Sequence, residues 1–123
     1  MTRSRRRAMT PQQIRTREER MRPSRFLGYD HDSLGIHLIR IDSLELAESE
    51  LRRAAWLNPF EPRFMKHLAW CLYKKGALPE AHEWISRALA SKPNDVQSRQ
   101  ILDLIMEKGR IANDGESPGA RTP

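Results

Sequence analysis

The sequence predicts an all-α protein built from antiparallel helix-hairpin repeats, and three observations support this. The chain resembles itself at a spacing of 34 residues. Leucines four residues apart give the first half of each copy an apolar helical face, and a proline closes the second half. Self-similarity at this period is typical of stacked helical arrays. The paired positions are Leu34/Leu68, Gly35/Ala69, Leu38/Leu72, Ala47/Ala81, Leu51/Ile85, Ala54/Ala88 and Pro59/Pro93.

Length and composition limit the chain to one modest domain. It has 123 residues, of which 38% are hydrophobic and 31% charged. No apolar run approaches the ~20 residues of a membrane-spanning helix, so we expect no membrane insertion, and no secretory signal is evident. Cys71 is the single cysteine, which excludes an intramolecular disulfide and fits a reducing compartment. We therefore expect a cytoplasmic protein, bacterial in style.

The first hairpin is expected to contain helices at 30–41 and 44–57. Leu34 and Leu38 form the apolar stripe of its first helix, and Gly35 beside them allows a second helix to approach closely. Asp42, followed three residues later by Glu45, resembles a capping box at the start of the second helix.

The second hairpin is expected to contain helices at 61–75 and 79–91. Pro62 suits the first turn of its first helix, and Leu68 and Leu72 repeat the apolar stripe. Gly76 can adopt a positive φ in the turn, and Pro79 can open the second helix.

A single helix at 95–109 is expected to close the array. Asn94 with Gln97 offers a cap, and Leu102 and Met106 continue the stripe of Leu68 and Leu72. The small position now holds Asp103, and no further helix follows, as expected of a terminal capping helix. Residues 111–123 are small, polar and broken by Gly and Pro, which indicates a disordered tail.

With these positions, residues 28–109 resemble the tetratricopeptide repeat (TPR) family, with repeats at 28–61 and 62–95 and the capping helix within a domain of 26–110. The resemblance implies a binding scaffold whose stacked first helices line a concave groove for a peptide or a partner helix. The first copy departs from the family pattern, because His31 stands where an aromatic residue is usual and Asp42 replaces the turn glycine.

By this resemblance, the ligand face carries basic and aromatic side chains that could hold an acidic segment with a hydrophobic anchor. These residues are Arg63, Lys66, Trp70, Tyr73 and Lys74 in the second hairpin, with Ile36 and Arg40, beside Asp32 and Ile39, in the first. Packing of Trp70 and Tyr73 against a neighbouring helix is the alternative. Trp56 and Trp84 fall on second helices and are expected in the core or on the convex surface. The expected function is protein–protein interaction, as a small adaptor or chaperone-like module.

Catalytic and cofactor motifs are absent from the sequence. There is no phosphate-binding loop, no G-x-S-x-G elbow and no H-E-x-x-H. His67 and Cys71 are spaced to share a metal on a helix, but no second ligand pair follows, so a small buried thiol beside a surface histidine is the ordinary interpretation. We expect no enzyme activity, no cofactor and no metal.

Residues 1–25 form an arm with nine arginines against two glutamates, whereas the remainder is close to neutral. Three interpretations stay open: a disordered solubilising tail, partly untranslated if Met9 is the true start; a site for RNA or DNA; and a mitochondrial presequence. Nucleic-acid binding through this arm is the alternative function.

The outer side of the first hairpin has no preceding helix to cover it. The segment Phe26–Tyr29 could fold back onto it, or a second copy of the chain could dock there as a homodimer.

Overall fold

A computed structural model describes residues 8–14 and 27–115, and within these ranges it is helical without strands. The helices of the domain are α2 (Tyr29–Arg40), α3 (Leu44–Leu57), α4 (Pro62–Lys75), α5 (Leu78–Ser91) and α6 (Val96–Gly115). Every expected boundary lies within one residue of the observed one except the end of α6. In the described residues, none of the helices is sufficiently long and apolar to span a bilayer.

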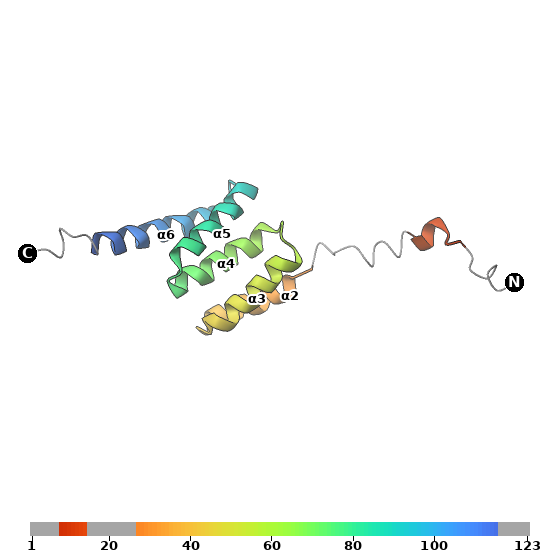
Figure 1. Cartoon of the computed structure of the whole chain (residues 1–123), viewed down its shortest axis with the longest axis horizontal. Helices are drawn as coiled ribbons and strands as arrows, with labels where there is room; N and C mark the ends of the chain where they lie inside the picture. The colour runs from red at the N-terminus through yellow and green to blue at the C-terminus, as the bar shows by residue number, and fades with distance from the viewer. Residues whose placement is uncertain (1–7, 15–26, 116–123) are drawn as a thin grey trace, which may run out of the picture.

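The five helices form successive antiparallel hairpins (Figure 1). Each helix packs on the next, and α4 also contacts both α2 and α6. The first helices of the hairpins therefore lie side by side along one side of the domain, while α3 and α5 lie on the other. This arrangement confirms the predicted all-α hairpin fold.

Small and apolar residues at equivalent positions are buried in both hairpins, which supports the 34-residue register. Ala47 and Ala81 are fully buried, as are the pairs Leu51/Ile85 and Ala54/Ala88. A Cβ atom at Gly35 would lie 2.6 Å from Cγ of Leu51, so α2 and α3 approach each other at a distance that only glycine permits at that position.

The apolar stripe of the first hairpin is more open than expected. Leu34 is 44% exposed and Leu38 is half-buried, whereas Leu68 and Leu72 are buried. The two leucine stripes are therefore not equivalent in burial, contrary to the prediction from the repeat. Helix α4 is enclosed between α3 and α5, whereas no described helix packs on the outer side of α2.

The turn of the first hairpin differs from the predicted capping box. The N-cap of α3 is Ser43, and Asp42 instead has a φ of 62°. This matches Gly76, which lies 34 residues further on with a φ of 88°. Aspartate is one of the few side chains that tolerate this conformation, so Asp42 takes the role of the turn glycine.

Helix α6 begins and packs differently from the prediction. Its cap is Asp95, whose Oδ2 accepts from the Ser98 backbone N–H at 3.1 Å and from its hydroxyl at 2.6 Å, so Asn94 does not fill this role. Ser98 and Ile105 are the buried residues on the inner side of α6, whereas Met106 is 57% exposed. Among the described helices, α6 packs only against α4 and α5, and they leave Met106 largely uncovered.

The end of α6 lies beyond the predicted stop at Gly109. Arg110 forms ion pairs with Glu107 at 2.6 Å and with Asp114 at 2.9 Å, one helical turn before it and one after it, and the pair with Glu107 spans Gly109. Residues 111–115, assigned above to a disordered tail, are therefore helical.

The N-terminal arm contains one helical turn at 11–14. Thr10 and Gln13 form a reciprocal capping box: the Thr10 N–H donates to Gln13 Oε1 at 2.9 Å, and the Gln13 N–H donates to Thr10 Oγ1 at 3.1 Å. The arm is thus not wholly without structure. Residues 1–7 and 15–26, on which its three interpretations depend, lie outside the described residues.

Gly28 and Tyr29 lie near the second hairpin and not on the outer side of the first. The Tyr29 ring packs edge-on against Phe64 of α4, with centroids 4.9 Å apart. Gly28 has a φ of 95°, and a Cβ there would lie 2.8 Å from the Phe64 ring. Tyr29 therefore faces the second hairpin, and Gly28 lies between Phe64 of α4 and Ala54 of α3. The expected fold-back is wrong for Tyr29, while Phe26 lies outside the described residues.

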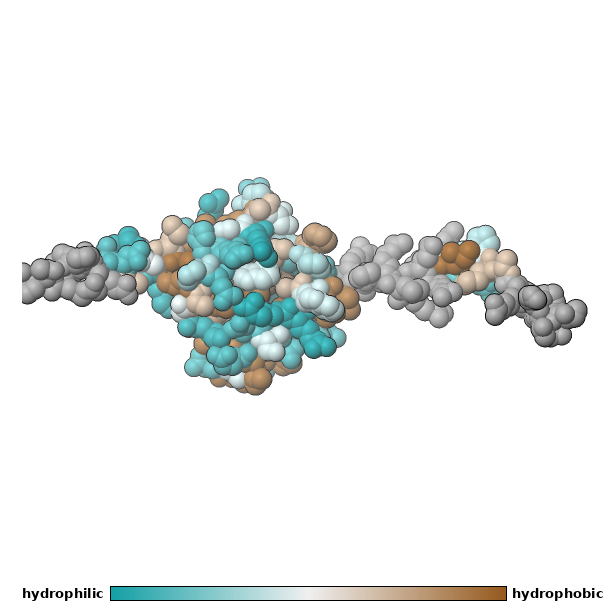
Figure 2. All heavy atoms as spheres, viewed as in Figure 1, coloured by the Kyte–Doolittle hydropathy of each residue, from teal (hydrophilic) through white to brown (hydrophobic). Residues whose placement is uncertain are grey.

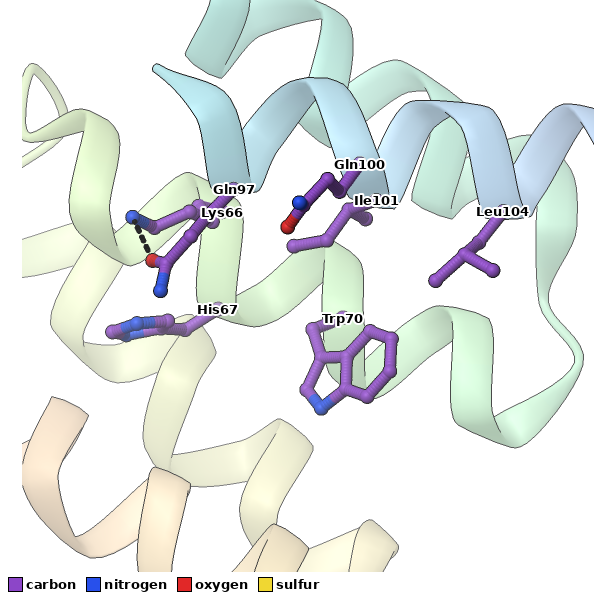
Figure 3. A pocket seen from close by; sticks show the side chains of 7 residues that line it. All are labelled: Lys66, His67, Trp70, Gln97, Gln100, Ile101 and Leu104. Carbon is purple, nitrogen blue, oxygen red and sulfur yellow. Dashed lines mark hydrogen bonds between the residues drawn. The ribbon is translucent and has the colours of Figure 1, made fainter.

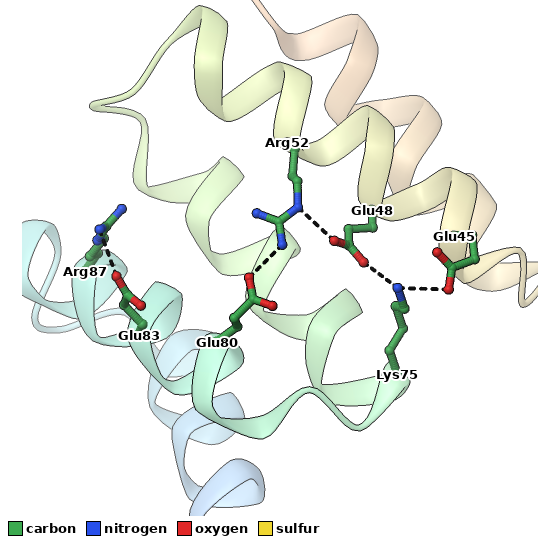
Figure 4. Close-up of polar contacts among 7 residues, drawn as sticks. All are labelled: Glu45, Glu48, Arg52, Lys75, Glu80, Glu83 and Arg87. Atoms are coloured by element: carbon green, nitrogen blue, oxygen red, sulfur yellow. Dashed lines mark hydrogen bonds and ion pairs between the residues drawn. The ribbon is translucent and has the colours of Figure 1, made fainter.

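Polar residues cover much of the face seen in Figure 2, with apolar residues mainly toward its margins. On α3, α4 and α5 the charges form a connected network (Figure 4). Arg52 bridges Glu48 and Glu80, each at 2.8 Å, and Lys75 bridges Glu48 at 2.5 Å and Glu45 at 2.9 Å. Glu48 thus links both hairpins. The hydrogen bond from Lys75, supported by that from Arg52, lowers the pKa of the Glu48 carboxyl.

This network predicts a specific pH dependence. Because the folded-state pKa of Glu48 lies below its ordinary value of 4.5, its stabilisation is present above that pH and is lost as the pH falls through the lowered pKa. Glu48→Gln is expected to reduce the free energy of unfolding by roughly 1 kcal/mol at neutral pH, with the difference from the wild type disappearing in acid.

Urea unfolding between neutral pH and about pH 3 measures this effect. Glu45→Gln is the matched control, because Glu45 pairs with the same lysine but its side chain is 86% exposed. A difference between Glu48→Gln and the wild type that stays constant with pH would contradict the prediction.

Candidate functional site

An open groove lies between α4 and α6 (Figure 3). Its volume is about 300 Å³, and its lining consists of Lys66, His67 and Trp70 from α4 with Gln97, Gln100, Ile101 and Leu104 from α6. Trp70, Ile101 and Leu104 make one end apolar, and the remaining side chains make the other end polar. The groove exists because α6 packs beside α4 in the same relation that α4 has to α2.

An aromatic stack stands beside the apolar end of the groove. The rings of Trp70 and Tyr73 are 5.4 Å apart and inclined by only 21°. Lys74 Nζ lies 5.3 Å from the centre of the Trp70 ring, and Lys108 Nζ from α6 lies 4.7 Å from that of Tyr73. Each ring of the aromatic pair therefore has an ammonium group within cation–π distance.

Lys74 and Lys108 are exposed, and neither forms an ion pair with a carboxylate in the described residues. Their positive charges are consequently available at the rim of the groove. This combination can attract an acidic group while the neighbouring aromatic surface holds an apolar one.

Two other predicted basic residues are engaged within the domain. Arg63 Nε donates to Asp32 Oδ2 at 3.1 Å, and its guanidinium lies 5.7 Å from the Tyr29 ring centre. Lys66 Nζ donates to Gln97 Oε1 at 2.8 Å and lies 3.3 Å from Asp95. The Ser98 hydrogen bond, followed by that from Lys66, lowers the pKa of the Asp95 carboxyl. Lys66 lines the groove with its charge already balanced.

The structure places the seven predicted groove residues unevenly. Lys66 and Trp70 line the pocket, and Tyr73 and Lys74 stand beside it. Ile36 packs against the core, while Arg40 is exposed at the end of α2, and neither lines the pocket. Trp70 and Tyr73 are half-buried and pack against the core, as the packing alternative expects, and each keeps part of its ring exposed. Of the other tryptophans, Trp84 is half-buried beneath Arg87, and Trp56 is 80% exposed.

Sequence reasoning missed the contribution of α6 and of His67. The 34-residue period already places α6 in the same relation to α4 as α4 has to α2, so its polar residues could have been assigned to the groove. His67 is more than a surface histidine, because its Nδ1 lies 2.6 Å from Oδ1 of Asp32, which is fully buried. That pairing joins helices 35 residues apart and has no local signature.

Cys71 and His67 contact different groups: the ring of His67 meets Asp32, whereas the thiol of Cys71 is buried beside Leu44. Burial raises the pKa of the Cys71 thiol to about 11, and the thiol donates a weak hydrogen bond to the Leu44 carbonyl at 3.4 Å. Among the residues with described positions, no three His, Cys, Asp or Glu side chains gather where they could hold a metal ion.

A second hollow, of about 650 Å³, lies between the start of α5 and the second half of α6. Leu78, His82 and Met106 are among its lining residues. Its lining lacks the aromatic stack and the two lysines that stand beside the α4–α6 groove.

The fold and the groove define the class of the protein as an all-α helical-hairpin protein with an open groove between first helices. No protein-family model matches the chain, and the curated proteins include no sequence that matches it.

Proposed function

We propose that the protein is a protein–protein interaction module, a small adaptor or chaperone-like scaffold, that binds a peptide or helical segment in the α4–α6 groove. The observation that carries this proposal is the Trp70–Tyr73 stack, with Lys74 close to one ring and Lys108 close to the other, next to the apolar side chains of the groove. Membership of the TPR family and a cytoplasmic location belong to the same proposal. The repeated hairpins and the resemblance of their positions support the family assignment.

The chemistry of the groove favours a particular partner. An apolar side chain would cover Trp70, Ile101 and Leu104, and an acidic group would face the exposed lysines at the rim. Lys66 and Arg63 contribute less attraction, because their charges already meet Asp95 and Asp32. The acidic group is therefore expected toward the C-terminal end of α4.

Charge reversal at the rim tests this function. Peptides selected from a random library on the full chain are expected to be acidic with an apolar residue nearby. The double variant Lys74→Glu/Lys108→Glu should weaken their binding at least ~10-fold and reduce its dependence on salt, since two favourable charge contacts become repulsive. Binding is measured by calorimetry at two salt concentrations.

The matched control is Arg53→Glu, an exposed position on α3, away from the groove-forming helices. Its circular dichroism and its peptide affinity should both match those of the wild type. Peptides that bind the double variant as tightly as the wild type would exclude the groove as their site.

Nucleic-acid binding is a second candidate, favoured by the position of two aromatic residues. Trp56 and Phe60 are 80% and 86% exposed, and they lie where α3 ends and α4 begins. Gly28, which follows the arginine-rich arm, lies against Ala54 and Phe64 at this same end. Exposed aromatic rings beside basic charge can stack with unpaired bases.

Fluorescence anisotropy with a labelled single-stranded RNA tests the second candidate. If this candidate function is right, the full chain binds the RNA and the binding weakens as the salt concentration rises. The double variant Trp56→Ala/Phe60→Ala and the removal of residues 1–25 should each reduce the binding. No binding by the full chain at low salt excludes it.

A further inference from the structure

The polar end of the groove is organised by a buried carboxylate. Asp32 is fully buried, and each of its oxygens has a partner on α4. Oδ1 lies 2.6 Å from His67 Nδ1, and Oδ2 accepts from Arg63 Nε at 3.1 Å. Asp32 thus stands behind the groove wall, whereas His67 forms part of the wall itself.

The contact with Asp32 determines which ring nitrogen of His67 carries hydrogen. A carboxylate oxygen only accepts, so Nδ1 must be the donor. In a neutral imidazole the other nitrogen, Nε2, then has a free lone pair. No partner for Nε2 is present among the described residues, and the ring borders the groove, so Nε2 is available there as an acceptor.

A donor lies next to this acceptor. Gln97 Oε1 accepts from Lys66 Nζ at 2.8 Å, which fixes the orientation of the side-chain amide. Figure 3 shows the amide nitrogen of Gln97 on the side of the His67 ring. The polar end therefore offers one donor and one acceptor side by side, each held by a second residue.

We propose that this pair recognises a primary carboxamide, the side chain of an asparagine or glutamine in the partner segment. Such a group has an N–H and a C=O on one edge: its N–H donates to His67 Nε2 while its oxygen accepts from Gln97. A carboxylate has no hydrogen for Nε2. A trans peptide group has its N–H and C=O on opposite edges, so it cannot satisfy both residues at once. The inference rests on the proposed function and adds the identity of one recognised group.

Asp32 is a positioning residue, because it holds the hydrogen of His67 on Nδ1. The tautomer of His67 therefore measures its effect. A long-range ¹H–¹⁵N spectrum of the full chain at about pH 8 should show hydrogen on Nδ1 of His67. In Asp32→Asn the new amide can donate to Nδ1, so the hydrogen should move to Nε2. Arg63→Gln is the control: it removes the other Asp32 contact and should leave the tautomer unchanged. A wild-type His67 with hydrogen on Nε2, or on both nitrogens, overturns the proposal.

Three small probes then test the recognised group on the same protein. They are N-acetylleucine amide, its N-methylamide and N-acetylleucine itself, which share the apolar side chain and differ in the end group. The primary amide should shift the side-chain signals of His67 and Gln97, and the other two should bind roughly tenfold more weakly. In Asp32→Asn this preference should disappear.

The NMR signal of the Trp70 indole N–H distinguishes a failure of the carboxamide inference from a failure of the proposed function. If all three probes shift the Trp70 signal with equal affinity, the carboxamide inference is wrong and the proposed function stands. If no probe shifts the Trp70 signal, the groove does not accept an apolar ligand, and the proposed function fails together with the inference.

Discussion

Gly35→Leu is expected to abolish the cooperative unfolding of the protein or to cost about 3 kcal/mol or more. Even a single methyl group at this position would lie 2.6 Å from Cγ and Cδ2 of Leu51, which is fully buried. Cγ is not the free end of a flexible chain, so relief requires α2 and α3 to move apart. Thermal and urea unfolding followed by circular dichroism measure the loss.

Two comparisons make this result specific. Gly109→Ala, in α6, has no atom within 4 Å of the added methyl group and should stabilise the protein by ~0.5–1 kcal/mol, as expected for alanine in an open helix. The double variant Gly35→Ala/Leu51→Ala should cost less than the sum of its single variants, because the second change removes the clash. An unchanged melting temperature for Gly35→Leu would refute the register of the repeat.

Phe64→Ala is expected to destabilise the protein by ~3–5 kcal/mol, a large fraction of the stability of a domain of this size. Phe64 is the largest of the fully buried side chains, and it joins Tyr29, Ala54 and Ala55 into a second apolar cluster. Its loss leaves a cavity and removes the contact that attaches the start of α2 to the second hairpin.

Phe60→Ala is the matched control for Phe64→Ala, because the same change is made four residues away at a side chain that is 86% exposed. Its free energy of unfolding should stay within ~0.5 kcal/mol of the wild type. Similar losses at both positions would show that the packing around Phe64 differs from that described.

Helix positions were largely predictable because the signals that begin and end helices are local. Pro62 occupies the first turn of α4, and Gly76 ends the same helix with a positive φ, as expected from their residue types. The prediction failed at the end of α6 because a glycine stop was inferred at Gly109, whereas the helix continues to Gly115 with Arg110 paired to Glu107 across that glycine and to Asp114 one turn beyond.

The groove was predictable only in part, since it depends on contacts between helices. Basic and aromatic residues of α4 could be placed on one face from their spacing. Which of the lysines stay unpaired could not, because that depends on partners elsewhere in the chain: Lys66 meets Asp95, whereas Lys74 meets the ring of Trp70.

The sequence by itself determined the helices, their order and the 34-residue register, because helix caps, breakers and apolar spacing act within a few residues. Only the tertiary structure decided which residues at equivalent positions of the repeat differ in burial, as the exposed Leu34 and the buried Leu68 do. It also joined Asp32 to His67 across 35 residues and brought α6 beside α4 to form the groove. The physical reason is that burial and polar pairing depend on the neighbours of a helix, and a repeat supplies different neighbours at its ends than in its middle.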